Sequence, residues 1–236
     1  MSLRKQFTRL ASASLDLLFP PRCVSCNREG HFLCDACLDS LPHLLQPYCT
    51  RCAQPVEGGD TCGRCSTLPL DIDGIRSPFL MEGAVREAIH RLKYSNLRAI
   101  APVLGRLLSD FLASQEIAAD VLVPVPLHPR RQRQRGYNQA HLLAKEVGSR
   151  LGIPVTSHAL SRSRDTPPQA RSPSAQERRT NVAHSFRCTE HQAIAGQKVL
   201  LVDDVCTTGA TLEACAIALK EAGAASVWGV ALAREA

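Results

Sequence analysis

The chain has 236 residues, a formal net charge of +6 and 44% hydrophobic residues, which suit one or two globular domains. It contains no run of 18 apolar residues, so the sequence excludes a membrane-spanning helix. A basic start is followed by a short apolar stretch that includes an acid, which is not a signal-peptide pattern. Many cysteines without an export signal favour a cytoplasmic protein.

Eight of the 11 cysteines form four C-x-x-C pairs in the first 65 residues. A tetrahedral zinc site needs four thiolates, and each C-x-x-C turn presents two of them. The spacing therefore predicts two structural Zn²⁺ sites. A sequential assignment is the simplest, although spacing does not exclude an interleaved one, and a disulfide framework is less favoured because the chain continues into an α/β pattern. The sequential ligands are Cys23, Cys26, Cys34 and Cys37 for one site, and Cys49, Cys52, Cys62 and Cys65 for the other.

From residue 74 onward, strand-like and helix-like patterns alternate, which predicts an α/β domain with a mainly parallel sheet flanked by helices. We therefore divide the chain into a zinc-ribbon module (residues 1–73) and an α/β domain (residues 74–236). The predicted strands are residues 75–80, 121–125, 199–202 and 226–232, and the predicted helices are residues 84–94, 100–112, 138–151, 176–182 and 210–222.

The segment after the predicted strand 121–125 reads PLHPRRQRQRGYNQA. We expect it to be a loop at the carboxyl edge of the sheet, where guanidinium groups and bare amides suit an anion. A solvated basic turn is the alternative. Arg135 is the first candidate for a direct contact, followed by Gly136, Tyr137, Asn138 and Gln139.

A second loop, residues 161–180, is rich in proline, serine and arginine and is long for a compact domain. Loops of this kind are often lids or binding segments. The alternative for each residue is a helix cap or solvated surface. The candidate contacts are Arg164, Thr166, Gln169, Arg178 and Asn181.

Residues 199–211 read VLLVDDVCTTGAT. The apolar run predicts a strand buried on both faces, and the loop after it then lies at the N-terminus of a helix, which suits a phosphate. Asp203 and Asp204 can accept sugar hydroxyls or hold the water shell of Mg²⁺. These groups together describe a site for a phosphorylated sugar. At a helix N-terminus, the thiol of Cys206 is expected to have a lowered pKa.

This stretch resembles the phosphoribosyl-pyrophosphate (PRPP) motif of type I phosphoribosyltransferases. The resemblance implies their fold, and it places the catalytic Asp203 and Asp204 on the ribose hydroxyls. It also implies that the arginine-rich segment receives the pyrophosphate with Mg²⁺ and that loop 161–180 closes over the substrate. The residues expected around the 5′-phosphate are Cys206, Thr207, Thr208, Gly209, Ala210 and Thr211.

The whole chain is similar to the ComF-like family. The segments that carry this resemblance are LLFPPRCVSC, the paired C-x-x-C knuckles, HRLKYSN, VPVPLHPRRQRQRGYNQ, TPPQARSPSAQERRTNV and VDDVCTTGAT. The resemblance implies a zinc module, a type I phosphoribosyltransferase fold and a link to DNA uptake in natural transformation. The chain departs from the family pattern in having two cysteine knuckles where a single one would satisfy it.

Residues 121–190 contain 12 Lys and Arg but only 4 Asp and Glu, which predicts an anionic partner. PRPP accounts for part of this excess, and single-stranded DNA is a second candidate, although aromatic residues are sparse in this span. We expect a PRPP-binding protein that supports DNA uptake or nucleotide metabolism. The alternatives are an active phosphoribosyltransferase on an unidentified nucleobase or amine, and a zinc-dependent interaction module that binds single-stranded DNA.

Overall fold

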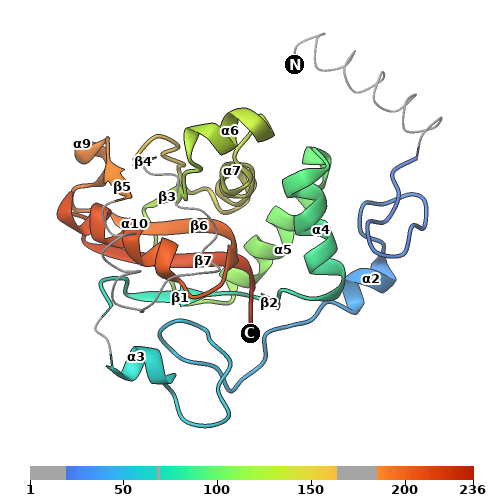
Figure 1. Ribbon diagram of the computed structural model, residues 1–236, viewed down its shortest axis with the longest axis horizontal. Coiled ribbons are helices and arrows are strands. Elements are labelled where there is room, and N and C mark those ends of the chain that lie inside the picture. Colours follow the sequence, from blue (N-terminus) through green and yellow to red (C-terminus); the bar gives the residue numbers. More distant parts are fainter. Residues whose placement is uncertain (1–19, 68–69, 164–184) are drawn as a thin grey trace.

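The computed structural model describes residues 20–67, 70–163 and 185–236 (Figure 1). A parallel sheet lies at its centre, with the strand order β1-β7-β6-β3, and β2 also pairs with β7. The strands are β1 (Gly74–Arg76), β2 (Phe79–Leu80), β3 (Val121–Pro124), β6 (Lys198–Cys206) and β7 (Ser226–Arg234). The predicted α/β fold with a parallel sheet is confirmed.

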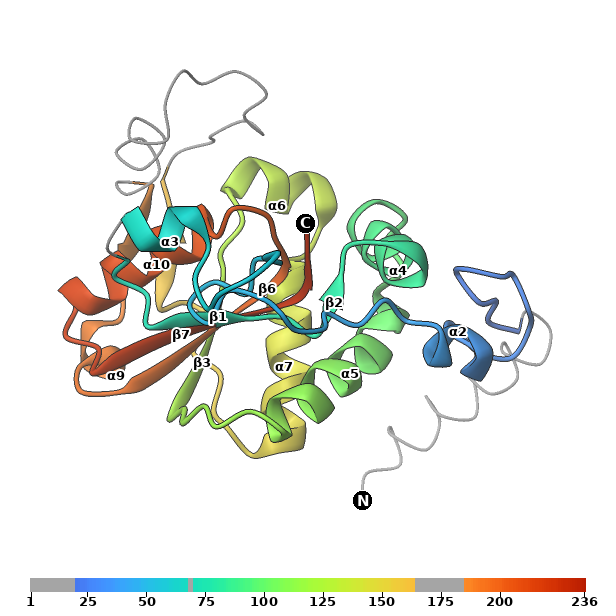
Figure 2. The same cartoon turned by 90° about the horizontal axis from the view of Figure 1, so that it is seen from below.

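The two faces of the sheet are covered by different helices, because successive side chains of a strand point to opposite faces. Leu200 and Val202 of β6 pack with α4 (Gly83–Tyr94), α5 (Ala101–Ala113) and α7 (Gln139–Leu151). Val199 and Leu201 pack with α10 (Ala210–Glu221) on the other face. Figure 2 shows α10 on the opposite side of the sheet from α5 and α7. A short 3₁₀ turn, η1 (Arg98–Ile100), leads into α5.

The predicted single strand 75–80 is divided into β1 and β2. Both keep the same register on β7, with Gly74 opposite Trp228 and Phe79 opposite Ala233. The break falls at Pro78, which has no N–H to donate to a sheet. Beside it, the Ser77 hydroxyl donates to the Ala231 carbonyl oxygen over 2.8 Å, and this bond holds the segment between β1 and β2 against β7.

Several short elements were not predicted. An antiparallel pair, β4 (Leu160–Arg162) and β5 (Phe186–Cys188), packs against α10, and α9 (His191–Ile194) follows it. These elements have three or four residues, too few for a hydrophobic period to appear. The predicted helix 176–182 lies outside the described residues.

The cysteine-rich segment lies along the β1–β2 edge and α4 (Figure 1). Its helices are α2 (Asp35–Asp39) in the first unit and α3 (Gly63–Thr67) in the second. The Leu44 amide donates to the Pro78 carbonyl oxygen and the Leu80 amide to that of Pro42, each over 2.8 Å. The Ile75 amide donates to the Arg51 carbonyl oxygen over 2.7 Å. Backbone from the cysteine-rich segment thus occupies hydrogen-bonding groups of this sheet edge.

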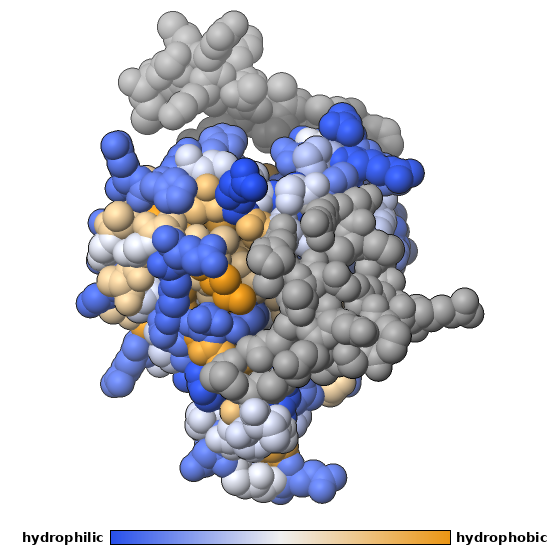
Figure 3. All heavy atoms as spheres, turned by 60° about the vertical axis from the view of Figure 1, so that its left-hand side comes forward, coloured by the Kyte–Doolittle hydropathy of each residue, from blue (hydrophilic) through white to orange (hydrophobic). Residues whose placement is uncertain are grey.

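Within the described residues, no helix has the length and apolar character that crossing a membrane requires. Polar side chains surround a smaller apolar area on the face seen in Figure 3. The large apolar side chains that remain well exposed in the described parts of the chain are Leu45 and Tyr94.

Candidate functional site

A cavity of about 580 Å³ opens at the carboxyl edge of the sheet, where ligands bind in open α/β folds. Residues 125–127 after β3, Thr207 and Thr208 after β6, and Glu235 after β7 all line it. Two carboxylates, Asp203 and Asp204, face it from β6. The basic side chains in its walls are Arg86, His90, Lys93, Arg131 and Arg162.

Strand β6 is longer than predicted and carries both carboxylates within it. The sequence suggested a strand that ends at Val202, but Asp203 is paired with Ala231 and Cys206 with Arg234 of β7. Pairing with β7 therefore extends the strand despite the low strand propensity of aspartate. Because neighbouring strand residues face opposite sides, the two acids enter the cavity from different faces of the sheet.

Asp204 is 3% exposed and forms an ion pair with Lys93 of α4, with 2.9 Å between Oδ1 and Nζ. Its other oxygen, Oδ2, is buried and has no hydrogen-bond partner among the described residues. A buried carboxylate oxygen without a donor is costly, and native proteins normally satisfy such atoms. This oxygen is thus available to a hydroxyl or a hydrated cation in the cavity.

Asp203 is half-buried, and its Oδ1 accepts the Asp204 amide over 2.8 Å. Burial and the neighbouring charge of Asp204 raise the pKa of Asp203 to about 7, against the opposing effects of Lys93, the Asp204 amide and Arg162. When two carboxylates share a partly desolvated site, ionising both has an electrostatic free-energy cost. A ligand that brings hydroxyl donors or a divalent cation would favour the ionised pair.

We call residues 207–211 the Thr-Gly loop. Its Thr207 and Thr208 side chains are exposed, and Gly209 is the N-cap of α10 with φ +78°. A Cβ at Gly209 would lie 2.8 Å from Ile75 Cδ1, so both the backbone and the space require glycine here. The Ala210 amide donates to Thr208 Oγ1 over 3.4 Å, and because the N-cap offers no side-chain acceptor, the next amides of the first turn of α10 remain available to an anion. Ala210 and Thr211 also line the cavity.

Cys206 differs from the expectation for its thiol. Its side chain is 2% exposed, belongs to the core beneath α10, and does not line the cavity. Burial raises the pKa of the Cys206 thiol, although Arg234 opposes this shift. The expected lowering by the helix N-terminus is wrong, because the sulfur lies in the core rather than at the helix end.

The arginine-rich segment is a helix and not the predicted loop: it forms α6 (Pro129–Arg135). His128 caps its first turn by accepting the Arg130 amide over 3.3 Å. The half-buried Arg131 lines the cavity. Arg135 lines a neighbouring hollow instead, where it donates to Gln139 Oε1 over 2.5 Å and lies 5.4 Å from the centre of the Tyr94 ring.

Of the other candidates in this segment, Gln139 is buried and lines the cavity, whereas three have structural contacts. Gly136 ends α6 in the left-handed conformation at φ +79°. The buried Tyr137 donates its hydroxyl to the Leu92 carbonyl oxygen. Asn138 is the N-cap of α7 and donates to the Val125 carbonyl oxygen over 2.9 Å. The candidates Arg164, Thr166, Gln169, Arg178 and Asn181 lie outside the described residues.

Residue-level reasoning did not assign a role to the basic face of α4. Arg86, His90 and Lys93 have the spacing i, i+4, i+7, which places them on one side of a helix. That spacing was a usable signal in the sequence. Arg162 of β4 had no comparable signal, because only the fold brings it to the cavity.

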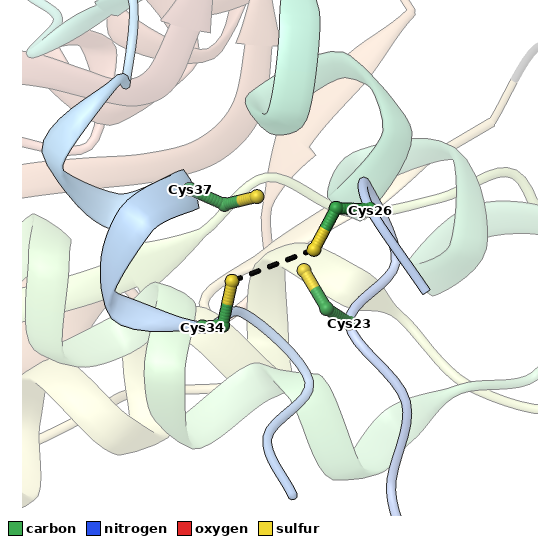
Figure 4. A group of neighbouring side chains, drawn as sticks. All are labelled: Cys23, Cys26, Cys34 and Cys37. Atoms are coloured by element: carbon green, nitrogen blue, oxygen red, sulfur yellow. Dashed lines mark hydrogen bonds between the residues drawn. The ribbon is translucent and has the colours of Figure 1, made fainter. Parts of the chain in front are cut away.

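The eight cysteines form two groups of four, in the sequential arrangement: residues 23, 26, 34 and 37, and residues 49, 52, 62 and 65. Their sulfurs point toward a common centre in the first group (Figure 4). Within each group the sulfurs lie within 4.8 Å of one another. Zinc–sulfur bonds of about 2.3 Å in a tetrahedron place sulfurs about 3.8 Å apart, so both donor sets fit Zn²⁺.

One thiol in each group is prepared for metal binding. Burial raises the pKa of Cys23 and of Cys49, but hydrogen bonds from backbone amides of both C-x-x-C pairs of each group outweigh it and lower both to about 6. Thiolates are therefore accessible near neutral pH.

Comparisons with known proteins cover both parts of the chain. A double zinc ribbon model matches residues 14–66, and a phosphoribosyl transferase domain model matches residues 134–236. The chain is 31% identical to competence protein F of Haemophilus influenzae, over 90% of this chain and 97% of that protein. It is 31% identical to DNA utilization protein YhgH of Escherichia coli K12, over 89% and 96% of the two chains.

Competence protein ComFC of Bacillus subtilis is 30% identical over 86% of this chain and 84% of that protein. Among solved structures, glutamine PRPP amidotransferase from B. subtilis superimposes with a TM-score of 0.42 at 20% identity, over 61% of this chain and 30% of that chain. The domain models and the sheet topology identify the fold.

Proposed function

Since the chain belongs to the ComF-like family, a group of phosphoribosyltransferase-domain proteins with a zinc ribbon, we propose that its central cavity binds PRPP with Mg²⁺. The observation that carries this proposal is the Oδ2 of Asp204, which is buried without a partner among the described residues at a cavity that five basic side chains also line. An acceptor of this kind suits the ribose hydroxyls, and the basic walls suit the phosphates.

The remaining groups of PRPP have matching partners in this arrangement. We assign the 5′-phosphate to the Thr-Gly loop, where hydroxyls and the first amides of α10 are available. Asp203 and Asp204 receive the ribose hydroxyls, and the same carboxylates would hold the water shell of Mg²⁺, which would offset the charge of the phosphates. We assign the pyrophosphate to Arg131 and Arg162 rather than to Arg135, whose side chain faces the neighbouring hollow.

The other predicted residues take supporting parts in this proposal. Gly136, Tyr137 and Asn138 fix the turn between α6 and α7, so they position Gln139 at the cavity. Cys206 anchors the strand below the Thr-Gly loop. The candidates Arg164, Thr166, Gln169, Arg178 and Asn181 keep their proposed role as contacts to the bound sugar phosphate.

We propose a role in DNA uptake or utilisation, because the relatives are named competence and DNA utilization proteins. Ligand binding, rather than transfer to a base, is the activity we favour, because no described segment identifies a nucleobase pocket. The eight thiolates require a reducing compartment, for which we propose the cytoplasm.

Single-stranded DNA is a second candidate ligand, because the structure supplies the aromatic surface that the basic segment lacks. Tyr94 is 68% exposed and lines a hollow of about 560 Å³ together with Arg98, Arg131, Arg133 and Arg135. A base can stack on an exposed tyrosine while arginines contact the backbone. Loss of Tyr94 would then weaken oligonucleotide binding without changing its salt dependence, whereas loss of Arg133 would reduce the salt slope by about 0.7.

Calorimetric titration with Mg²⁺ and PRPP tests the main proposal. We expect binding by the wild type and a loss of more than about tenfold in Asp203→Asn/Asp204→Asn, since each charged hydrogen bond contributes about 1.5–3 kcal/mol. The control is Asp110→Asn, an exposed acid of α5 outside the cavity. Equal affinity in the double variant and the wild type would place the site elsewhere. Pyrophosphate release in the presence of nucleobases would show transfer instead of binding alone.

A further inference from the structure

The two four-cysteine units contact different parts of the α/β domain. Cysteines of the first unit share the core of α4 and α5, whereas Cys49, Cys52 and Cys65 share the core that contains Ile75 and Cys206. The second unit therefore lies next to the strand end that carries the Thr-Gly loop.

Arg234, the last residue of β7, connects the second unit to the residue before the Thr-Gly loop. Its guanidinium donates to Gln54 Oε1 over 2.6 Å and to Cys206 Sγ over 2.9 Å. The side chain is 1% exposed, and its Nε has no hydrogen-bond partner in the described parts of the chain. Within the described ranges, no carboxylate pairs with this buried cation. Buried charges normally require a compensating charge.

The second four-cysteine site can supply that charge. Zn²⁺ bound by four thiolates has two more negative than positive charges. Cys52 and Cys62 line a hollow of about 400 Å³ together with Arg234 and Gln54. A loaded site thus places its excess negative charge beside the guanidinium, which stabilises Arg234 in its buried position.

The Thr-Gly loop separates this hollow from the central cavity, because Thr207 and Thr208 line both. Arg64 of α3 approaches the loop from the zinc side, where its Nη1 lies 3.9 Å from a Cβ position at Gly209. A displacement of the second unit therefore moves one wall of the ligand cavity.

We infer that Gln54 and Arg234 are positioning residues that couple metal binding at the second four-cysteine site to the Thr-Gly loop. Loss of the second zinc loosens the loop, and by reciprocity a phosphorylated ligand on the loop slows release of that zinc. Among the residues that the structure describes, the first unit has no such connection to the loop. The ligand half of the inference rests on the proposed function, and the metal half stands on the contacts of Arg234.

The first experiment needs no ligand, because buried Cys206 reports on the loop. Native protein is treated with N-ethylmaleimide, and peptide mass spectrometry follows modification of Cys206 alongside zinc content. We expect Gln54→Leu to increase Cys206 modification about fivefold and to speed loss of one zinc, while Gln54→Glu, which keeps an acceptor for Arg234, behaves like the wild type. The matched control is Arg22→Leu, which removes the ion pair with Glu29 in the first unit. Equal Cys206 modification in Gln54→Leu and Arg22→Leu overturns the inference.

The second experiment measures zinc release to a chromogenic chelator with and without Mg²⁺ and PRPP. Mapping of the freed cysteines by alkylation identifies which site loses its metal. We expect the ligand to slow release from the second site about fivefold in the wild type and not in Gln54→Leu. If PRPP binds but release from the second site is unchanged, the inference is wrong. If the wild type does not bind PRPP, the proposed function is wrong, and modification of Cys206 still decides the coupling.

Discussion

The raised pKa of Asp203 predicts that this residue destabilises the folded protein at neutral and alkaline pH. The folded protein holds the Asp203 proton up to about pH 7, whereas the unfolded chain loses it near pH 3.8. Stability therefore falls as the pH rises from about 4 to 7 and then levels, because the folded state binds more protons over that interval. Asp203→Asn removes the ionisation but keeps an oxygen for the Asp204 amide.

The size of the effect follows from the pKa interval. Movement from 3.8 to about 7 sets a ceiling of ~4 kcal/mol at about 1.36 kcal/mol per pH unit. Asp203 retains contact with solvent, which screens its interactions, so we expect about half of this ceiling. The variant should thus exceed the wild type in unfolding free energy by ~2 kcal/mol at pH 8 and by almost nothing at pH 4.

Urea unfolding followed by circular dichroism at both pH values measures this difference. Asp110→Asn, an exposed acid of α5, serves as the control and should show little change at either pH. A stability difference between Asp203→Asn and the wild type that is the same at pH 4 and pH 8 would refute the reasoning. So would a variant that is less stable at pH 8. The expected result would mean that the site is maintained at the expense of stability.

Three further predictions concern the metal, the loop and the ion pair. Elemental analysis of purified protein should give two zinc ions per chain, and one zinc, no zinc or four disulfides would contradict the assignment of the two groups. Gly209→Ala should destabilise the fold by about 1–2 kcal/mol and weaken PRPP binding in calorimetry, because its Cβ would meet Ile75; unchanged affinity would argue against the loop as the phosphate site. Lys93→Met should cost about 2–3 kcal/mol in urea unfolding, because Asp204 loses its buried counter-charge, and Lys93→Arg should retain most of the stability. The cost of Lys93→Met should largely disappear in an Asp204→Asn background, and a persistent cost would show that packing of the lysine matters instead.

Sequence reasoning identified the features that are local along the chain. The C-x-x-C pairs and the Asp203–Thr211 stretch each place their functional groups within a few residues. Spacing alone therefore indicated the metal ligands and the candidate sugar-phosphate site. The buried strand and helix around that stretch followed from the same short pattern. The boundary at residues 73 and 74 remains a prediction.

The arginine-rich helix could have been found from signals other than hydrophobic periodicity. α6 has a proline at its first position, a capping His128 before it and a left-handed Gly136 after it. These are standard start and stop signals. The segment has no hydrophobic periodicity because none of its residues is buried, and for that reason the sequence pattern predicted a loop.

The rest of the site depends on contacts between segments far apart in the sequence. Lys93 lies 111 positions before Asp204, and Tyr94 approaches Arg135 only because α4 and α6 are neighbours in space. The extension of β6 through both carboxylates likewise depends on β7, which supplies the hydrogen-bonding partners. Such pairings are not encoded in the local pattern of either segment.

The backbone hydrogen bonds that residues 42–51 make at the edge formed by β1 and β2 also occupy groups through which an open sheet edge can pair with another molecule. An uncovered outer strand presents free N–H and C=O groups to other molecules, and Pro78 alone interrupts this row only once. Here the covering segment is held between two metal-binding units that are too small to fold without their metal. Zinc depletion would therefore expose the β1–β2 edge of a sheet whose strands are strongly apolar. The cysteines of this protein thus help to cover a sheet edge that lies apart from the central cavity.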